Sequence, residues 1–214
     1  MSFMRKGWVV CALVSVWVDA SSANPGVFAA NCTVPAHFAL VGSNSGVPDG
    51  VGSFTIVVRD IANNPANGAS VVIDLSNCAD LALCSNPLDP SAIVNCAAKT
   101  ERKFTDITGS VTFTLVGGSN GSGNASTLAS AVKIQANGVP IGSPTASAFD
   151  LDGHGGVGVN DLSVWLSDYG APGNPSYARS DFDGSGAVDV NDLSVWLTVF
   201  SRGGSTEGCA AFCP

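Results

Sequence analysis

The hydrophobic and polar positions in the first two thirds of the chain follow the pattern of β-strands. Four segments rich in Val, Ile, Thr and Phe are bounded by clusters of Gly, Asn and Pro, as strands between turns are. Asn137-Gly138 has the composition of a hairpin turn and precedes a short segment at 139–142. No helical period separates these segments, so we expect a β-sandwich. The four segments are 53–59, 69–75, 109–116 and 131–136.

The last third of the chain has a helical pattern that occurs twice. Residues 150–169 and 181–200 are identical at 13 of 20 aligned positions, which indicates an internal duplication. In the second half of each copy, apolar residues recur at i, i+3, i+4 and i+7, the spacing of one helix face. They are Leu162, Trp165, Leu166 and Tyr169 in the first copy, and Leu193, Trp196, Leu197 and Phe200 in the second.

The turns between the predicted strands have a sequence pattern that is found in a known class of β domain. A strand ending in Arg59-Asp60 leads through Asn64-Pro65 and Asn67-Gly68 into a second strand, and Thr105 to Gly109 lead into a third. This arrangement resembles the bacterial immunoglobulin-like domains of the invasin and intimin kind, which implies an Ig-like β-sandwich over residues 31–146. We expect 78–102 to be a long disulfide-pinned loop, and 142–148 has the composition of a linker.

Each repeat opens with a twelve-residue, acid-rich loop whose spacing suits calcium. Such a loop supplies oxygens from positions 1, 3, 5, 7, 9 and 12 and has glycine at position 6, here Gly155 or Gly186. His154 and Gly158 make the first loop poorer in oxygen ligands, so we expect the second site to bind more tightly. The alternative is a pair of Asx-rich turns without metal. The candidate ligands are Asp150, Asp152, His154, Asp161 and the Gly156 carbonyl in the first loop, and Asp181, Asp183, Ser185, Asp189, Asp192 and the Ala187 carbonyl in the second.

The surroundings of the loops distinguish the repeat from an ordinary EF-hand. Position 12 is Asp instead of Glu, and proline-bearing segments precede each loop where an entering helix would lie. We expect Val157 and Val188, at position 8, to pair across the two loops as a short β-bridge. A duplicated calcium loop, each with an exiting helix and Asp at position 12, resembles a type I dockerin.

The dockerin resemblance covers residues 147–203 and implies a module that binds a protein partner called cohesin, often in secreted polysaccharide-degrading assemblies. The predicted fold class is therefore mainly β with a small α module: an Ig-like β-sandwich followed by a duplicated EF-hand-like (F-hand) dockerin fold. Trp165 and Trp196 could belong to the recognition surface along the exiting helices, but we expect them to pack against each other in a small core. The family's recognition positions correspond here to Val159, Asn160, Leu166 and Ser167 in the first repeat, and Val190, Asn191, Leu197 and Thr198 in the second.

Charge and the N-terminal segment narrow the class of protein. The 214 residues carry a net charge of −8, which excludes nucleic acid as the main partner because such binding relies on Lys and Arg. Residues 1–23 have a basic start, an apolar run and small residues, as in an export signal, although a buried strand is the alternative. The run is too short to span a membrane. We therefore expect a secreted bacterial protein, extracellular or at the cell surface.

The cysteines agree with export. Outside the signal segment there are six, an even number that favours disulfides over a zinc site. They allow 15 pairings. A local Cys209–Cys213 bond within a C-terminal tail, 204–214, would leave four cysteines to tie strand ends of the β domain. The six are Cys32, Cys78, Cys84, Cys96, Cys209 and Cys213.

Motifs for catalysis are weak. Gly153 to Gly158 match a dinucleotide pattern but lie inside a calcium loop, and Gly117 to Gly121 match a hydrolase pattern without the helix that should follow. We therefore expect a non-catalytic calcium-binding protein that attaches to a cohesin-type partner. The first alternative is an intramolecular role, in which the repeats stabilise their own β domain when calcium is bound. The second is a hydrolase acting on polysaccharide.

Overall fold

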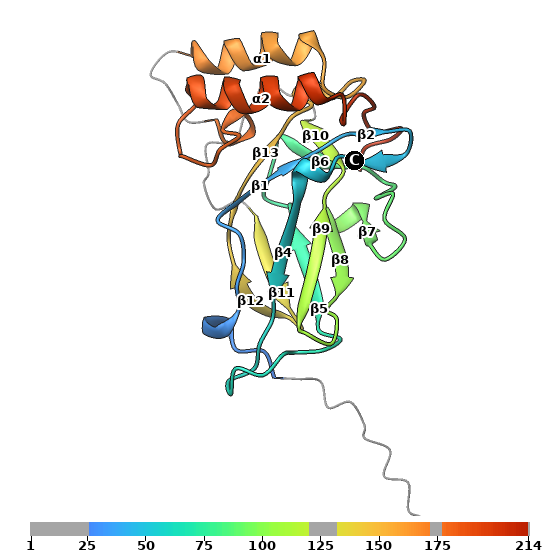
Figure 1. The fold of residues 1–214 in the computed structure, drawn as a ribbon, viewed down its shortest axis with the longest axis vertical. Coiled ribbons are helices and arrows are strands. Elements are labelled where there is room, and N and C mark those ends of the chain that lie inside the picture. Colours follow the sequence, from blue (N-terminus) through green and yellow to red (C-terminus); the bar gives the residue numbers. More distant parts are fainter. Residues whose placement is uncertain (1–25, 120–131, 172–176, 214) are drawn as a thin grey trace, which may run out of the picture.

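The computed structural model describes residues 26–119, 132–171 and 177–213. Helices and strands form where the repeat and the β pattern predict them, although most elements are shorter than the segments (Figure 1). The predicted export signal at 1–23 lies outside the described residues. The strands are β1 (His37–Leu40), β2 (Ser43–Asn44), β3 (Val47–Pro48), β4 (Ser53–Val57), β5 (Ser70–Asp74), β6 (Leu81–Leu83), β7 (Ile93–Asn95), β8 (Thr100–Phe104), β9 (Ser110–Thr114), β10 (Gly117–Ser119), β11 (Lys133–Ala136), β12 (Val139–Gly142) and β13 (Thr145–Ala148), and the helices are α1 (Val159–Tyr169) and α2 (Val190–Arg202), with 3-10 turns η1 (Ala29–Asn31), η2 (Gly50–Gly52), η3 (Cys96–Ala98) and η4 (Ala178–Ser180).

The largest sheet is antiparallel and has the strand order β12-β11-β5-β8-β7. Strand β5 shows why the pattern predicts it: Val71 and Ile73 are buried, whereas the residues that alternate with them are half-buried, as on a strand with one face in the core. Between β11 and β12, Asn137 and Gly138 both have positive φ, 48° and 81°. That geometry fits the predicted two-residue hairpin turn.

A two-stranded sheet of β4 and β9 packs its apolar residues into the same core as the large sheet. Ile56 and Phe113 are fully buried there. Rings of Phe38, Phe54 and Phe113 stack in sequence, with centroids 4.7 and 5.9 Å apart. The apolar faces that the sequence pattern predicts therefore meet in one cluster.

The second half of the segment with linker composition, Thr145–Ala148, is a strand. Residues of β13 pair in parallel with β1, from His37 opposite Thr145 to Leu40 opposite Ala148. The pairing continues when Phe149 N donates to Leu40 O over 3.2 Å. Small residues such as Ala146 and Ala148 are buried here, and their size allows the strand to lie against the core. The loops and helices thus start directly from a paired strand.

The predicted fold class is wrong in its two components, although the protein is mainly β. Among the described residues, the strands form one five-stranded sheet and four two-stranded sheets, whereas an Ig sandwich has two larger facing sheets. The repeats also differ from an EF-hand pair: Val157 N donates to Ser205 O over 2.7 Å, and no Val157–Val188 bridge occurs within the described ranges. The chain after α2 takes the position at which the second loop would pair.

The region 78–102 is more ordered than the predicted loop, and the predicted cysteine pairing is wrong. It contains β6, β7 and the start of β8. Two disulfides join it to the C-terminal residues, Cys84 to Cys209 and Cys96 to Cys213. Cys32 and Cys78 are free thiols. Cys209 and Cys213 do not pair with each other because the C-terminal segment lies along β6, where Cys213 N donates to Leu83 O over 2.8 Å.

The helices lie at one end of the molecule (Figure 1), and their tryptophans are buried. Trp165 and Trp196 are each 1 % exposed, in a second apolar cluster that also contains Ala39 and Val41 of the β body. Each indole stacks on a ring one turn later in its helix, Trp165 on Tyr169 and Trp196 on Phe200. Both tryptophans are therefore core residues, and the cluster that holds them is shared with the β body.

Glu101 of β8 is a buried carboxyl inside the main core. One of its oxygens, Oε2, has no hydrogen-bond partner, and burial raises the pKa of Glu101 to about 8. The folded protein therefore holds a proton that the unfolded chain releases near pH 4.3. The stability that the protonated Glu101 contributes is fully present below about pH 4.3 and is lost as the pH rises to about 8.

We expect the free energy of unfolding to fall between pH 5 and pH 9. In the Glu101→Gln variant this fall should be smaller by on the order of 4 kcal/mol. Glutamine keeps the shape of the side chain and cannot ionise. Urea unfolding of both proteins across this range measures the difference. Parallel pH profiles of the two proteins would show that Glu101 ionises as an ordinary glutamate.

Candidate metal centre

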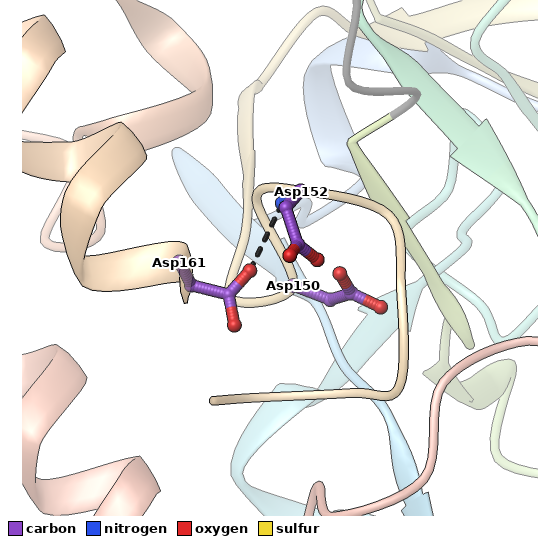
Figure 2. A group of neighbouring side chains, drawn as sticks. All are labelled: Asp150, Asp152 and Asp161. Carbon is purple, nitrogen blue, oxygen red and sulfur yellow. Dashed lines mark hydrogen bonds between the residues drawn. The ribbon is translucent and has the colours of Figure 1, made fainter. Parts of the chain in front are cut away.

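Each repeat brings three aspartates together. In the first, the structure gathers Asp150, Asp152 and Asp161, with one carboxylate oxygen from each lying within 4.8 Å of the others (Figure 2). Asp150 and Asp152 come from the loop after β13, and Asp161 comes from the first turn of α1. The second repeat gathers Asp181, Asp183 and Asp192 within the same limit. These are loop positions 1, 3 and 12 in both copies.

Backbone hydrogen bonds hold the aspartate at position 12 in the same way in both loops. Asp161 Oδ1 accepts from Leu151 N and Asp152 N, at 2.6 and 2.9 Å, and its Oδ2 accepts from Gly158 N at 2.6 Å. In the second loop Asp192 accepts from the residues at the same positions, over 2.7 to 3.1 Å. The carboxylate therefore ties the start of the loop to the start of the helix.

The aspartates at positions 1 and 3 are fixed by the turn of the loop. Asp150 Oδ1 and Asp152 Oδ1 both accept from His154 N, at 3.1 and 2.8 Å, and Ser185 N makes the matching pair of bonds in the second loop. Gly155 and Gly186 at position 6 have φ of 74° and 88°, a conformation that favours glycine. The repeated glycine thus permits the sharp turn.

The two sites differ at Asp150. Its Oδ2 is buried and has no hydrogen-bond partner, whereas Asp181 Oδ2 accepts from Gly186 N at 2.9 Å. Burial, followed by the charges of Asp161 and Asp152, raises the pKa of Asp150 to about 7. Burial also raises the pKa of Asp161, Asp181 and Asp192. A cation between the carboxylates would give the buried Asp150 oxygen a partner and would offset the repulsion between the negative charges.

The remaining predicted ligands lie beside the triads. His154 is exposed, and its Nδ1 lies 2.7 Å from Asp152 O, so the ring does not join the first triad. Asp189 serves as the N-cap of α2, where its Oδ1 accepts from Asn191 N at 2.7 Å. Ala187 O accepts from the Ser185 hydroxyl at 3.3 Å. Gly156 packs against the chain that follows α2.

The predicted recognition residues do not line the metal sites. They lie on α1 and α2 or at their first turns, and all eight are exposed: Val159, Asn160, Leu166, Ser167, Val190, Asn191, Leu197 and Thr198. Tyr169 and Phe200 extend the same exposed surface. The structure thus separates each repeat into a loop that holds the carboxylate triad and an exposed helix face.

Sequence reasoning missed a buried ion pair beside the sites. Arg179 of η4 donates through Nε and Nη2 to Asp168 of α1, over 2.8 and 2.7 Å, and Ser180 Oγ donates to the same carboxylate over 2.5 Å. Both charged residues are buried. A signal was present, because Asp168 is the one acid of residues 150–192 outside the calcium pattern and Arg179 is the single base there.

The second loop also has a neighbour that the sequence did not reveal. His37 of β1 lies against Gly184, close enough that a side chain at residue 184 would meet its imidazole. Its Nδ1 is 2.8 Å from Thr145 Oγ1. Burial lowers the pKa of His37. The β body therefore supports the second loop through the β1–β13 pair.

The disulfides and the helices bear on where the protein is located, and comparisons with known proteins bear on its family. The two disulfides are typical of proteins from oxidising compartments. Within the part of the chain that the structure describes, neither helix has the length and apolar character to cross a membrane. Comparison with protein-family models, with curated proteins and with solved structures gives no match.

Proposed function

We propose that this protein is a secreted, non-catalytic calcium-binding protein whose two metal loops hold a pair of helices in place for attachment to a protein partner. The observation that carries the calcium assignment is the pair of repeat-related carboxylate triads, one of which includes a buried oxygen of Asp150 without a partner. The donors are carboxylate oxygens, which suit hard cations. A twelve-residue loop with several protein oxygens favours calcium over magnesium, because magnesium retains more of its water.

The chain's own residues link the ion to the helices. Asp161 and Asp192 would each offer an oxygen to calcium while they accept hydrogen bonds from the loop that precedes their helix. The ion would also neutralise charge at the first turn of α1 and α2. Because calcium binds the folded loops and not the unfolded chain, its binding energy becomes folding energy.

The outer helix face supports the attachment role. Its six large apolar residues are between 42 and 70 % exposed and occupy equivalent positions in the two repeats. The acids of the helices, Asp161, Asp168 and Asp192, are all buried, so the exposed face of α1 has no charge and that of α2 has only Arg202. Solvent-facing helix surfaces are normally charged, and depletion of charge is typical of an interface centre. The six are Val159, Leu166 and Tyr169, and Val190, Leu197 and Phe200.

A shallow, open hollow lies on the same face of α2, lined by Val190, Leu193, Leu197 and Phe200 among others. An apolar side chain of a partner would fit such a hollow. The partner that the repeat's resemblance implies is a cohesin, and this remains the partner we propose.

A second candidate function is intramolecular stabilisation, which the packing of the helices favours. Trp196 Nε1 donates to Phe149 O over 3.4 Å, and the rings of Phe149 and Phe182 stack 5.1 Å apart. Ala39 and Val41 of the β body share this cluster. In this candidate the loops would fasten α1 and α2 to the body, and no external partner would be required.

Binding of the full chain to purified cohesins, in calcium and in EGTA, tests the proposal. We expect binding in calcium alone. Unchanged thermal stability from EGTA to millimolar calcium would overturn the calcium assignment. Calcium-dependent stability with no binding to cohesins, and no self-association in sedimentation, would favour the intramolecular role.

Charge placed on the helix face should abolish attachment and leave the metal sites intact. We expect Leu166→Asp with Leu197→Asp to weaken partner binding about 100-fold or more, because each carboxylate would be buried in an apolar interface. Calorimetric calcium titration should be unchanged, since neither residue is in a triad. Ile107→Asp is the matched control, as Ile107 is 81 % exposed on a turn before β9. Equal loss in the control would argue against a specific face.

A further inference from the structure

The chain that follows α2 forms a strap, residues 203–213, fastened to the β body along its length. Asn44 Nδ2 donates to Gly203 O over 2.8 Å. Ser43 and Glu207 exchange two backbone hydrogen bonds, of 2.9 and 2.8 Å. The disulfides of Cys209 and Cys213 hold its far end. The strap is therefore a structural part of the body and not a free tail.

The strap also lies against the first metal loop. Val157 N at loop position 8 donates to Ser205 O over 2.7 Å. A methyl group on Gly208 would stand 2.7 Å from Gly156 N and 2.9 Å from Asp150 Oδ2. Gly156 has no room for a side chain on the strap side, where Ser205 O lies. The strap thus contacts positions 6 to 8 of the loop and the unpartnered carboxylate oxygen at position 1.

Ser205 is held from the body side as well. It is buried, and its Oγ donates to Asp49 Oδ2 over 3.0 Å. Asp49 also pairs with Arg202 at the end of α2. The side chain of Ser205 is therefore held by a buried hydrogen bond, and this fixes the carbonyl of the same residue, which accepts from Val157 N. Beyond Ser205, the two disulfides fasten the strap.

The second loop is supported by the β body instead of by the strap. Its neighbours are His37, which lies against Gly184, and Phe149, whose ring stacks on Phe182. The first loop is also the one with His154 and Gly158 in place of oxygen ligands at positions 5 and 9. A loop with fewer ligands gains more from being held in its binding shape, because preorganisation reduces the cost of ordering it.

We propose that the disulfide-anchored strap is a positioning element for the first calcium site, so that calcium affinity at that site depends on the Cys84–Cys209 bond while affinity at the second site does not. The inference rests on the proposed calcium function. Gly208, next to Cys209, is the strap residue that packs on Asp150. Loss of the bond would let the strap move away, and the loop would lose the Val157–Ser205 hydrogen bond.

The test uses two full-length proteins with one site each. A first-site protein carries Asp181→Asn and Asp192→Asn, and a second-site protein carries Asp150→Asn and Asp161→Asn. Calorimetric titration with calcium ions gives the affinity of each site. The titration is then repeated after the disulfide is removed from each protein by Cys84→Ser with Cys209→Ser.

We expect removal of the disulfide to weaken the first site about tenfold or more, which corresponds to one hydrogen bond lost, and to leave the second site within about twofold. Gly208→Ala should also weaken the first site, because its methyl group would push the strap away while both disulfides stay intact. Ala210→Ser, on the exposed part of the strap, is the matched control and should change neither affinity.

Three results would overturn the inference. Unchanged affinity of the first site without the disulfide is one, and an equal loss at both sites is another, because a general unfolding would affect both. Absence of calcium binding in the oxidised, unsubstituted chain would overturn the proposed function and this inference together. Binding at both sites with equal sensitivity would leave the calcium function standing and remove only the role of the strap.

Discussion

In excess calcium, the full chain is expected to resist unfolding by about 5 kcal/mol more than it does in EGTA. Each ion that binds only the folded state adds about 2.7 kcal/mol when its concentration is a hundred times its dissociation constant, and there are two triads. In the absence of a cation, burial and then the charges of Asp161 and Asp152 raise the pKa of Asp150, so its ionised form is unfavourable in the folded loop. Urea or thermal unfolding at several calcium concentrations measures the effect.

Loss of position 12 in both loops should remove this stabilisation. Asp161→Asn with Asp192→Asn keeps one acceptor oxygen at each helix start but removes the charge that would face calcium. We expect the double variant to unfold alike in calcium and in EGTA. Asp106→Asn takes the same charge from an exposed turn, where the residue accepts from Thr108 N and Ser110 N, and it should keep the full calcium response. A calcium response in the double variant would show that the triads are not the sites.

Asp168→Asn is expected to lower the free energy of unfolding by about 3–5 kcal/mol, because it removes the carboxylate charge that faces the buried Arg179 guanidinium. The carboxylate accepts two hydrogen bonds from Arg179 and one from Ser180. Asp80 of the β body also acts on the charge of Arg179. The substitution would therefore loosen η4 from α1, and with it the chain that enters the second loop. Urea unfolding in saturating calcium measures the loss.

Asp89→Asn is the comparison for that experiment. Asp89 pairs with Lys103 at 2.7 Å, but its side chain is 29 % exposed, and water screens such a pair. We expect a loss of about 1 kcal/mol, as for pairs near the surface. Similar losses for the two variants would contradict the idea that burial makes the Asp168–Arg179 pair critical.

Local sequence patterns were sufficient for the elements of this protein. The repeated i, i+3, i+4, i+7 spacing predicted α1 and α2, and the period of two predicted strands such as β5, because these periods follow from backbone geometry within one segment. Asp150 and Asp161 could be grouped for the same reason: they are the first and last residues of a twelve-residue loop, and a glycine at its turn brings them together. Such contacts need no knowledge of the rest of the chain.

Contacts between distant segments were decided only by the tertiary structure. Nothing in the composition of 142–148 distinguishes a linker from a strand that pairs with β1, since Ser and Ala suit both. The pairing of Cys84 with Cys209, across 125 residues, depends on where the strap lies. The predicted sandwich failed on the same ground, because strand order and sheet size are set by which edges meet.

The sequence by itself thus determined the duplicated loops, their carboxylates and the helices that follow. Each of these features depends on residues that lie within one loop or within about two turns of one helix. The tertiary structure decided that the strap supports the first loop and His37 the second, and that the charged residues of α1 face inward. The physical reason is that burial and long-range pairing depend on packing between segments, and two similar repeats acquire different neighbours when they pack on an asymmetric body.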